Sequence, residues 1–266
     1  MVRTTISCML ILMAGSVLGQ NGKSKGALSP AEQTAAVNAV REYALNYTKS
    51  LPNYTCTLTT RHVANPPNAG NKEPPKRTDT EEQFSFVDGQ EVRTVTRIDG
   101  KPVSVQPGER LSEMSQGEFG NLLEGIFDPA TGAEVRWDRA ATLDKIKVDV
   151  LAFRVPQSKG YVLTARRGSM KVPFEGFVYA DAQTHAVLRL QMKCIMIPGT
   201  FPIQSVDLTI DYKAAQVAGH EFLLPSHFVL NYFNHENDRQ HVDDGRYWDY
   251  HQFSTNATLK LGDDKQ

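Results

Sequence analysis

Apolar and polar residues alternate one by one over much of the chain, which is the pattern of strands that bury one face. In residues 206–212 the even-numbered positions are Val, Leu, Ile and Tyr, and the odd-numbered positions are Asp, Thr and Asp. Successive side chains of a strand point to opposite faces, so this run predicts an antiparallel sheet with one apolar and one solvated face. Similar runs lie at residues 146–153, 161–167, 174–179, 187–197, 227–232 and 247–253.

Two Asp-Gly pairs mark reversals between strands in the first half of the chain. Asp88-Gly89 and Asp99-Gly100 each follow a run that is rich in β-branched or aromatic residues. Asp-Gly favours the tight hairpin turn in which both central residues take a positive φ. The two pairs therefore predict successive β-hairpins.

A first helix is predicted to begin after Ser29 and to end before Pro52. Ser29 and Glu32 match a capping box, and Pro30 suits the first helical position. Apolar residues then recur at spacings of three and four, at positions 37, 40, 44, 47 and 51. The opposite side carries few Lys and Arg, so packing on the protein's own sheet is favoured over a membrane surface.

A second, shorter helix is predicted to interrupt the strands. Ser115 and Glu118 match another capping box, and Asp128-Pro129 would stop the helix. Between them lies a bulky apolar face made of Phe119, Leu122, Leu123, Ile126 and Phe127. We expect this face to lie against the apolar side of the sheet.

The ends of the chain read as segments outside the folded unit. Arg3 precedes an apolar run at residues 6–18, and Val17 and Gly19 are small enough for a signal-peptidase site. The run is too short for a membrane anchor, which is the alternative. We expect a signal peptide at 1–19, a flexible tail at 20–28, one domain at 29–260 and a polar tail at 261–266. Residues 64–80, rich in Pro, Asn, Lys and Gly, predict a long loop.

Cleavage of the signal peptide would leave two cysteines, Cys56 and Cys194. Both fall on the apolar side of predicted strands, so both thiols should point into the core. An even number of cysteines in an oxidising compartment favours a disulfide between them. Two buried free thiols are the alternative, because the sequence does not give the Cα separation.

Composition disfavours nucleic-acid binding, and the histidine-rich carboxy-terminal region raises one metal hypothesis. The formal net charge is −1, which leaves no basic excess to bind nucleic acid. His235, Glu236 and His241, with Asp243 and Asp244 beyond them, offer zinc-type ligands but lack a recognised spacing. The polar stretch 234–245 is better interpreted as a solvated hairpin loop. We therefore predict no catalytic residue, no metal and no cofactor.

A resemblance to a known group of proteins rests on the order of these elements and on several short phrases. The phrases are Leu51-Pro52-Asn53 before Tyr54-Thr55-Cys56-Thr57, Gly125-Ile126-Phe127-Asp128-Pro129, Leu188-Arg189-Leu190, residues 197–202, Asp211-Tyr212 and Leu223-Leu224-Pro225. They resemble an uncharacterised family of secreted, acidobacterial-type proteins. The element order resembles the periplasmic lipoprotein-sorting carrier superfamily, the LolA-like half-barrels. The resemblance implies an α+β fold in which a strongly curved, mainly antiparallel sheet, a half-open β-barrel, wraps around both helices.

The resemblance also implies a function and a place for it. A groove between sheet and helices would hold a lipid or acylated peptide in the periplasm or outside the cell. The five apolar side chains of the second helix are the candidate groove residues. The alternative is that they plug the space between sheet and helices completely. Two other readings stay open: a protein-interaction module that meets an envelope partner through its loops 64–80 and 234–245, and a metal-dependent hydrolase.

Overall fold

The computed structural model describes residues 28–66, 73–103, 120–165 and 168–253. These contain the helices α1 (Pro30–Ser50) and α2 (Gly120–Phe127) and thirteen strands. The first six strands are β1 (Tyr54–Ala64), β2 (Lys76–Val87), β3 (Gln90–Ile98), β4 (Lys101–Pro102), β5 (Glu134–Leu143) and β6 (Ile146–Val155). The others are β7 (Tyr161–Ala165), β8 (Gly168–Val172), β9 (Phe174–Asp181), β10 (Val187–Cys194), β11 (Ile203–Val217), β12 (His220–Asn234) and β13 (Arg239–Gln252).

Eleven of these strands form one antiparallel sheet. Its order is β4-β3-β2-β1-β13-β12-β11-β10-β9-β6-β5, and β7 and β8 form a separate hairpin. Two meanders therefore meet where β1 pairs with β13, along ten residue pairs from Tyr54 and Gln252 to Ala64 and His241. The prediction of a curved antiparallel sheet is confirmed.

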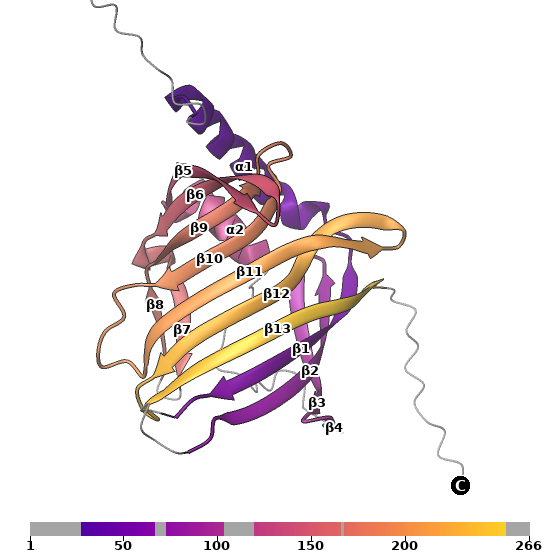
Figure 1. Ribbon diagram of the computed structural model, residues 1–266, viewed down its shortest axis with the longest axis vertical. Coiled ribbons are helices and arrows are strands. Elements are labelled where there is room, and N and C mark those ends of the chain that lie inside the picture. Colours follow the sequence, from indigo (N-terminus) through magenta and orange to yellow (C-terminus); the bar gives the residue numbers. More distant parts are fainter. Residues whose placement is uncertain (1–27, 67–72, 104–119, 166–167, 254–266) are drawn as a thin grey trace, which may run out of the picture.

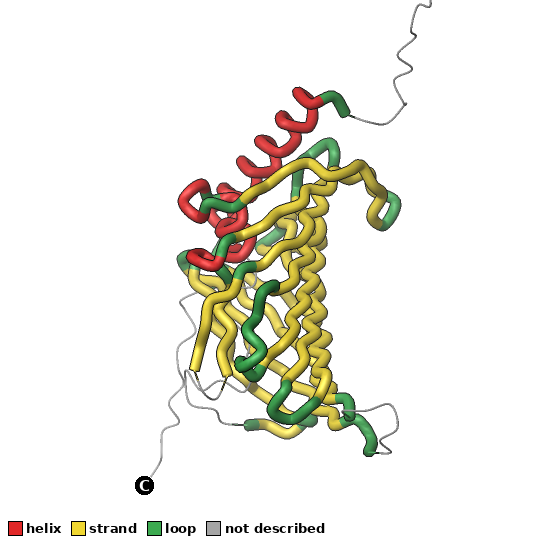
Figure 2. The backbone as a smooth tube through the Cα atoms, turned by 90° about the vertical axis from the view of Figure 1, so that its left-hand side faces the viewer, coloured by secondary structure: helices red, strands yellow, loops and turns green. Residues whose placement is uncertain are grey.

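The sheet is curved and stays open. Figure 1 shows the strands crossing the front of the molecule with α2 behind them. Figure 2 shows the sheet from its edge, with the helices on one side of its upper part. The edge strands β4 and β5 stand at opposite ends of the strand order and do not pair with each other. The concave side is thus a half-barrel with helices inside it.

The first helix begins and ends as its sequence predicts. Ser29 Oγ accepts from the backbone N–H of Glu32 at 3.3 Å, and Glu32 Oε2 accepts from the N–H of Ser29 at 2.7 Å. Its buried residues are Ala36, Val37, Val40, Ala44 and Tyr47. The helix ends at Ser50 because Pro52 disfavours a helical conformation in the residue before it.

The second helix ends directly before Asp128, as predicted. The Asp128 carboxylate then accepts from the N–H of Ala130 at 2.8 Å and starts a short 3₁₀ turn, Pro129–Thr131. The expected capping box of Ser115 and Glu118 lies outside the described residues.

Both Asp-Gly pairs form the predicted hairpin turns. Asp88 and Gly89 have φ of 49° and 76°, and Asp99 and Gly100 have φ of 48° and 73°. These positive values match the turn that follows the right-handed twist of the strands.

The stretch 234–245 is not the solvated loop that its polarity suggested. Strand β12 continues to Asn234 and β13 begins at Arg239, so only four residues make the turn. Asp243 and Gly245 are buried on the concave side. The prediction was wrong because inward-facing polar residues conceal the alternation. Part of the predicted loop 64–80 is also strand, since β1 runs to Ala64 and β2 starts at Lys76.

The core lies between the concave face of the sheet and the helices. The core contains side chains from both meanders. At Gly245 of β13, the ring of Phe228 occupies the space that a larger side chain would need. A Cβ at Gly245 would lie 2.0 Å from Phe228 Cε1. Phe228 is itself buried and lies beside Tyr247, with ring centroids 6.0 Å apart.

We expect Gly245→Ala to destabilise the fold by about 1–3 kcal/mol, because the packed Phe228 ring must leave its position. Urea unfolding measures the change. Gly199→Ala is the matched control, since a Cβ there meets no atom within 4 Å, and it should change stability by less than about 0.5 kcal/mol. Equal effects of the two substitutions would contradict this account of the core.

Candidate functional site

The concave face of the half-barrel is filled by apolar side chains of α2. Leu123, Ile126 and Phe127 are at most 2% exposed and belong to the same cluster as Leu151 and Phe153 of β6. Leu122 is partly buried against that cluster, and Phe119 lies outside the described residues. The helix therefore occupies the space in which the sequence placed a ligand groove, and the groove itself stays a prediction.

Helix α2 packs along α1. Thr48 Oγ1 of α1 donates to Glu124 Oε2 of α2 at 3.2 Å. Gly120 lies so close to α1 that a Cβ there would be 3.4 Å from the Cβ of Thr48. Apolar side chains of α1 and α2 belong to one buried cluster with those of the sheet, and this hydrogen bond adds a polar contact between the two helices.

A polar cluster, His62, Thr80 and Asp243, lies at another part of the concave face. His62 Nδ1 is 2.8 Å from Asp243 Oδ1, and His62 Nε2 is 3.1 Å from Thr80 Oγ1. The three residues come from β1, β2 and β13, and Asp243 pairs directly with His62 in the sheet register. Thr80 and Asp243 are buried, while 27% of the His62 side chain is exposed.

Two opposing effects act on the pKa of His62. Burial lowers it, but the hydrogen bond and charge of Asp243, with the nearby carboxylates of Glu82 and Asp79, outweigh burial and raise it above 6.5. His241 behaves in the opposite way. Burial is the main cause that lowers its pKa, and its ring stacks on Tyr232 at 4.6 Å between centroids.

The suggested zinc ligands are not brought together. Asp243 faces inward to His62, whereas its neighbour Asp244 binds His227 Nε2 at 3.0 Å. His241 lies against Tyr232. Because adjacent residues of a strand point to opposite faces, the acidic pair cannot share a site. Among the described residues, no group of three or more His, Cys, Asp or Glu is placed to hold a metal ion.

Sequence reasoning missed His62 and Thr80. Thr80 fell inside the segment interpreted as a loop, and His62 has no local motif. The one available signal was position: His62 continues the inward-facing series of Tyr54, Cys56 and Leu58 at a spacing of two.

The expected disulfide is absent, because Cys56 and Cys194 are both free and buried. Both thiols face inward as predicted, but Cys56 belongs to β1 and Cys194 to β10. Strands β13, β12 and β11 lie between these two in the sheet. A bridge requires Cα atoms within about 7 Å, whereas each step between neighbouring strands is about 4.8 Å.

Comparison with known proteins finds likeness only to solved structures. No protein-family model and no curated protein match the chain. A LolA superfamily protein from Nitrosomonas europaea aligns with a TM-score of 0.39 and 9% identity, over 82% of this chain and 94% of that one. An outer membrane lipoprotein-sorting domain, described as putative, from Vibrio parahaemolyticus gives 0.41 and 10%, over 83% and 92%.

A DUF1329 family protein from Desulfovibrio piger gives a TM-score of 0.38 and 9% identity, over 87% of this chain and 95% of that one. The half-open sheet itself follows from the strand pairing of this chain. No helix within the described residues is long and apolar enough to cross a membrane.

The raised pKa of His62 predicts a pH-dependent contribution to stability. Protonated His62 favours the folded state, so its contribution is complete below pH 6.5 and is lost as the pH rises through the raised folded-state value. The difference in unfolding free energy between wild type and His62→Gln should therefore be larger at pH 5.5 than at pH 8.5, measured by urea unfolding.

His241→Phe is the control for this pH effect, because it preserves the ring on Tyr232. The lowered pKa of His241 weakens the folded state as the pH falls, which is the opposite sign. If the difference in unfolding free energy between wild type and His62→Gln stayed constant with pH, the interaction of protonated His62 with Asp243 would not contribute to stability as described.

The free cysteines predict two slow thiols in protein that begins at residue 20. Burial raises the pKa of Cys56 and of Cys194 to about 12, so little thiolate exists at neutral pH. Ellman's reagent should detect two thiols in guanidinium chloride and almost none in native protein. Detection of no thiol after unfolding without reductant would instead establish a disulfide.

Proposed function

We propose that this protein is an exported, non-enzymatic carrier that holds a lipid or acylated peptide between the concave face of its sheet and α2. The observation that carries the proposal is the nature of α2. It is an eight-residue helix that fills the half-barrel with apolar side chains, and its described polar side-chain contact runs to α1. An acyl chain would offer the sheet the same kind of contact as this helix.

The free energy gained by burying the apolar side chains of α2 is comparable with that gained by burying an acyl chain. Exposing Leu123, Ile126 and Phe127 to water would cost about 1.5–3 kcal/mol each, or about 5–9 kcal/mol together. Burying a chain of about fourteen methylene groups from water returns about 11 kcal/mol at about 0.8 kcal/mol per group. A dispersed acyl chain therefore competes with α2 for its position. A chain already in a membrane has no such gain, so loading would need a donor.

The open form of the sheet supports entry from the side. Val135 and Trp137 of the edge strand β5 are partly buried and pack against the core. The apolar face therefore continues to an edge that has no partner strand beyond it in the described sheet. An acyl chain would not have to pass through the sheet to reach the position of α2.

The proposal places the protein in the periplasm or outside the cell, after removal of residues 1–19, which lie outside the described residues. Its partners would be the acylated ligand and an envelope protein that donates or accepts it. An interaction module is less well supported, because residues 234–245, one of its two loops, are mostly strand.

A covalent lock on α2 tests the proposal. In Thr48→Cys combined with Gly120→Cys, the Cβ separation of 3.4 Å is close to the range for a disulfide. The oxidised variant should lose binding of palmitate, supplied below its micellar concentration, at least tenfold. The reduced variant should bind as wild type does. Isothermal titration calorimetry measures the binding, and native mass spectrometry checks for co-purified lipid.

The same protein with and without reductant is its own control for folding. Absence of both saturable palmitate binding and co-purified lipid in the wild type would overturn the carrier function. Equal binding by oxidised and reduced forms would instead exclude displacement of α2 from α1 as the way in.

A further inference from the structure

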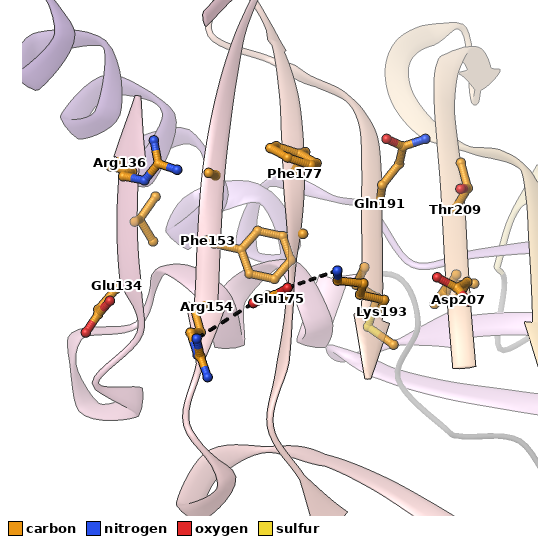
Figure 3. Close-up of a pocket in the computed structure, with 15 residues that line it drawn as sticks. Glu134, Arg136, Phe153, Arg154, Glu175, Phe177, Gln191, Lys193, Asp207 and Thr209 are labelled. Carbon is orange, nitrogen blue, oxygen red and sulfur yellow. Dashed lines mark ion pairs between the residues drawn. The ribbon is translucent and has the colours of Figure 1, made fainter. Parts of the chain in front are cut away.

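The face of the sheet that points away from the helices carries a hollow of about 820 Å³ (Figure 3). The proposed carrier function does not use this hollow. The hollow spans the five neighbouring strands β5, β6, β9, β10 and β11. The polar side chains of the lining, together with Phe177, face away from the helices, because they alternate along their strands with buried residues. Three of those buried residues, Phe153, Met192 and Leu208, also form part of the lining. The volume lies within the range of pockets for small ligands, about 300–1,000 Å³.

One side of the hollow is a row of charges that neutralise one another. Directly paired positions on the five strands give the series Glu134, Arg154, Glu175, Lys193 and Asp207. Lys193 Nζ lies 3.0 Å and Arg154 Nη1 3.9 Å from the Glu175 carboxylate. With Arg136, the lining has three cationic and three anionic groups. A strongly charged ligand would therefore gain little net attraction.

The next row combines an aromatic ring with uncharged hydrogen-bonding groups. Phe177, Gln191 and Thr209 occupy directly paired positions on β9, β10 and β11. Figure 3 shows the Phe177 ring at the upper end of the hollow, above the charged row. The guanidinium carbon of Arg139 lies 5.0 Å from the ring centroid. Such a cation–π contact holds the ring in place.

The amide of Gln191 is also held in position. Its Oε1 accepts from the hydroxyl of Tyr179 at 2.9 Å, and its amide nitrogen is a hydrogen-bond donor. The hydroxyl of Thr209 both donates and accepts. A ligand in the hollow would meet a fixed aromatic ring beside the amide of Gln191 and the hydroxyl of Thr209.

The position of the hollow within the sheet decides between ligand classes. Strand β9 pairs with β6 on one side and β10 on the other, so its backbone groups are already used. An extended peptide cannot add to the sheet here as a strand. Side chains alone must recognise the ligand, and sugar hydroxyls both donate and accept while sugar C–H faces stack on aromatic rings.

We propose that this hollow binds a neutral oligosaccharide, with Phe177 as the stacking platform and Gln191 and Thr209 as hydrogen-bonding groups. The site is separate from the acyl site, because the sheet lies between them. One site would bring an apolar ligand and the other would attach the protein to a glycan surface.

Titration of the whole chain from residue 20 with cellohexaose, maltohexaose and chitohexaose tests the site, with saturation-transfer NMR and calorimetry as readouts. At least one sugar should bind saturably. Phe177→Ala should weaken that binding about tenfold, the size of an aromatic contribution. The same variant should bind palmitate as wild type does, so failure of this site is distinguishable from failure of the carrier function.

Trp248→Ala is the matched control. Trp248 is another aromatic side chain on the same face of the sheet, 50% exposed and outside the hollow. Its removal should leave sugar binding unchanged. Three results would overturn the proposal: no saturable binding of any of the three sugars, an equal loss in both variants, or binding of a mixed tryptic peptide pool in place of the sugars.

Discussion

The pairing of β1 with β13 is the constraint on which the rest of the structure depends. It joins strands from the two ends of the described chain and turns two separate meanders into one continuous sheet. The buried core contains side chains of both meanders, so this core depends on their being joined. The same pairing brings His62 beside Asp243. Because the paired strands are so far apart in sequence, closing the chain costs entropy before any contact compensates for it, which is typical of slow-folding β-proteins.

Strand alternation gives the two faces of this sheet different chemistry. The concave face takes Val206, Leu208 and Ile210 from β11, whereas the other face takes Asp207 and Thr209 from the same strand. Neighbouring residues of one strand thus belong to the apolar interior and to a surface of paired charges in turn. A shift of register by a single residue would exchange the two faces, so the buried face fixes the register across the whole sheet.

Much of the fold could be predicted from local patterns. The capping box at Ser29, the Asp-Gly turns and the stop at Asp128 each depend on residues within a few positions of one another, so the sequence carries them directly. The β1–β13 pairing has no such local signal, and neither has the strand order that keeps Cys56 and Cys194 apart. The expectation of a disulfide failed for that reason: inward-facing thiols can be inferred from alternation, but their separation across the sheet cannot.

The residues of a candidate site could be predicted only where the spacing of apolar residues along the sequence marks them. The apolar face of α2 can be read from the spacing of Leu123, Ile126 and Phe127. By contrast, His62, Thr80 and Asp243 are polar residues on a buried face, and polarity alone indicates loops. Only the cross-strand register shows that they satisfy one another, because a buried carboxylate without such partners would be strongly unfavourable.

Apolar packing and hydrogen bonds hold different parts of the concave face. The two kinds of contact differ in how specific they are for their partner. Around α2, non-directional packing accepts any apolar group of suitable volume. At His62, the hydrogen bonds fix both ring nitrogens, and breaking the one to Asp243 would leave that carboxylate buried without its partner. The polar cluster holds β1, β2 and β13 together through hydrogen bonds. Under the proposed carrier function, this part of the wall would stay rigid while α2 gave way to a ligand.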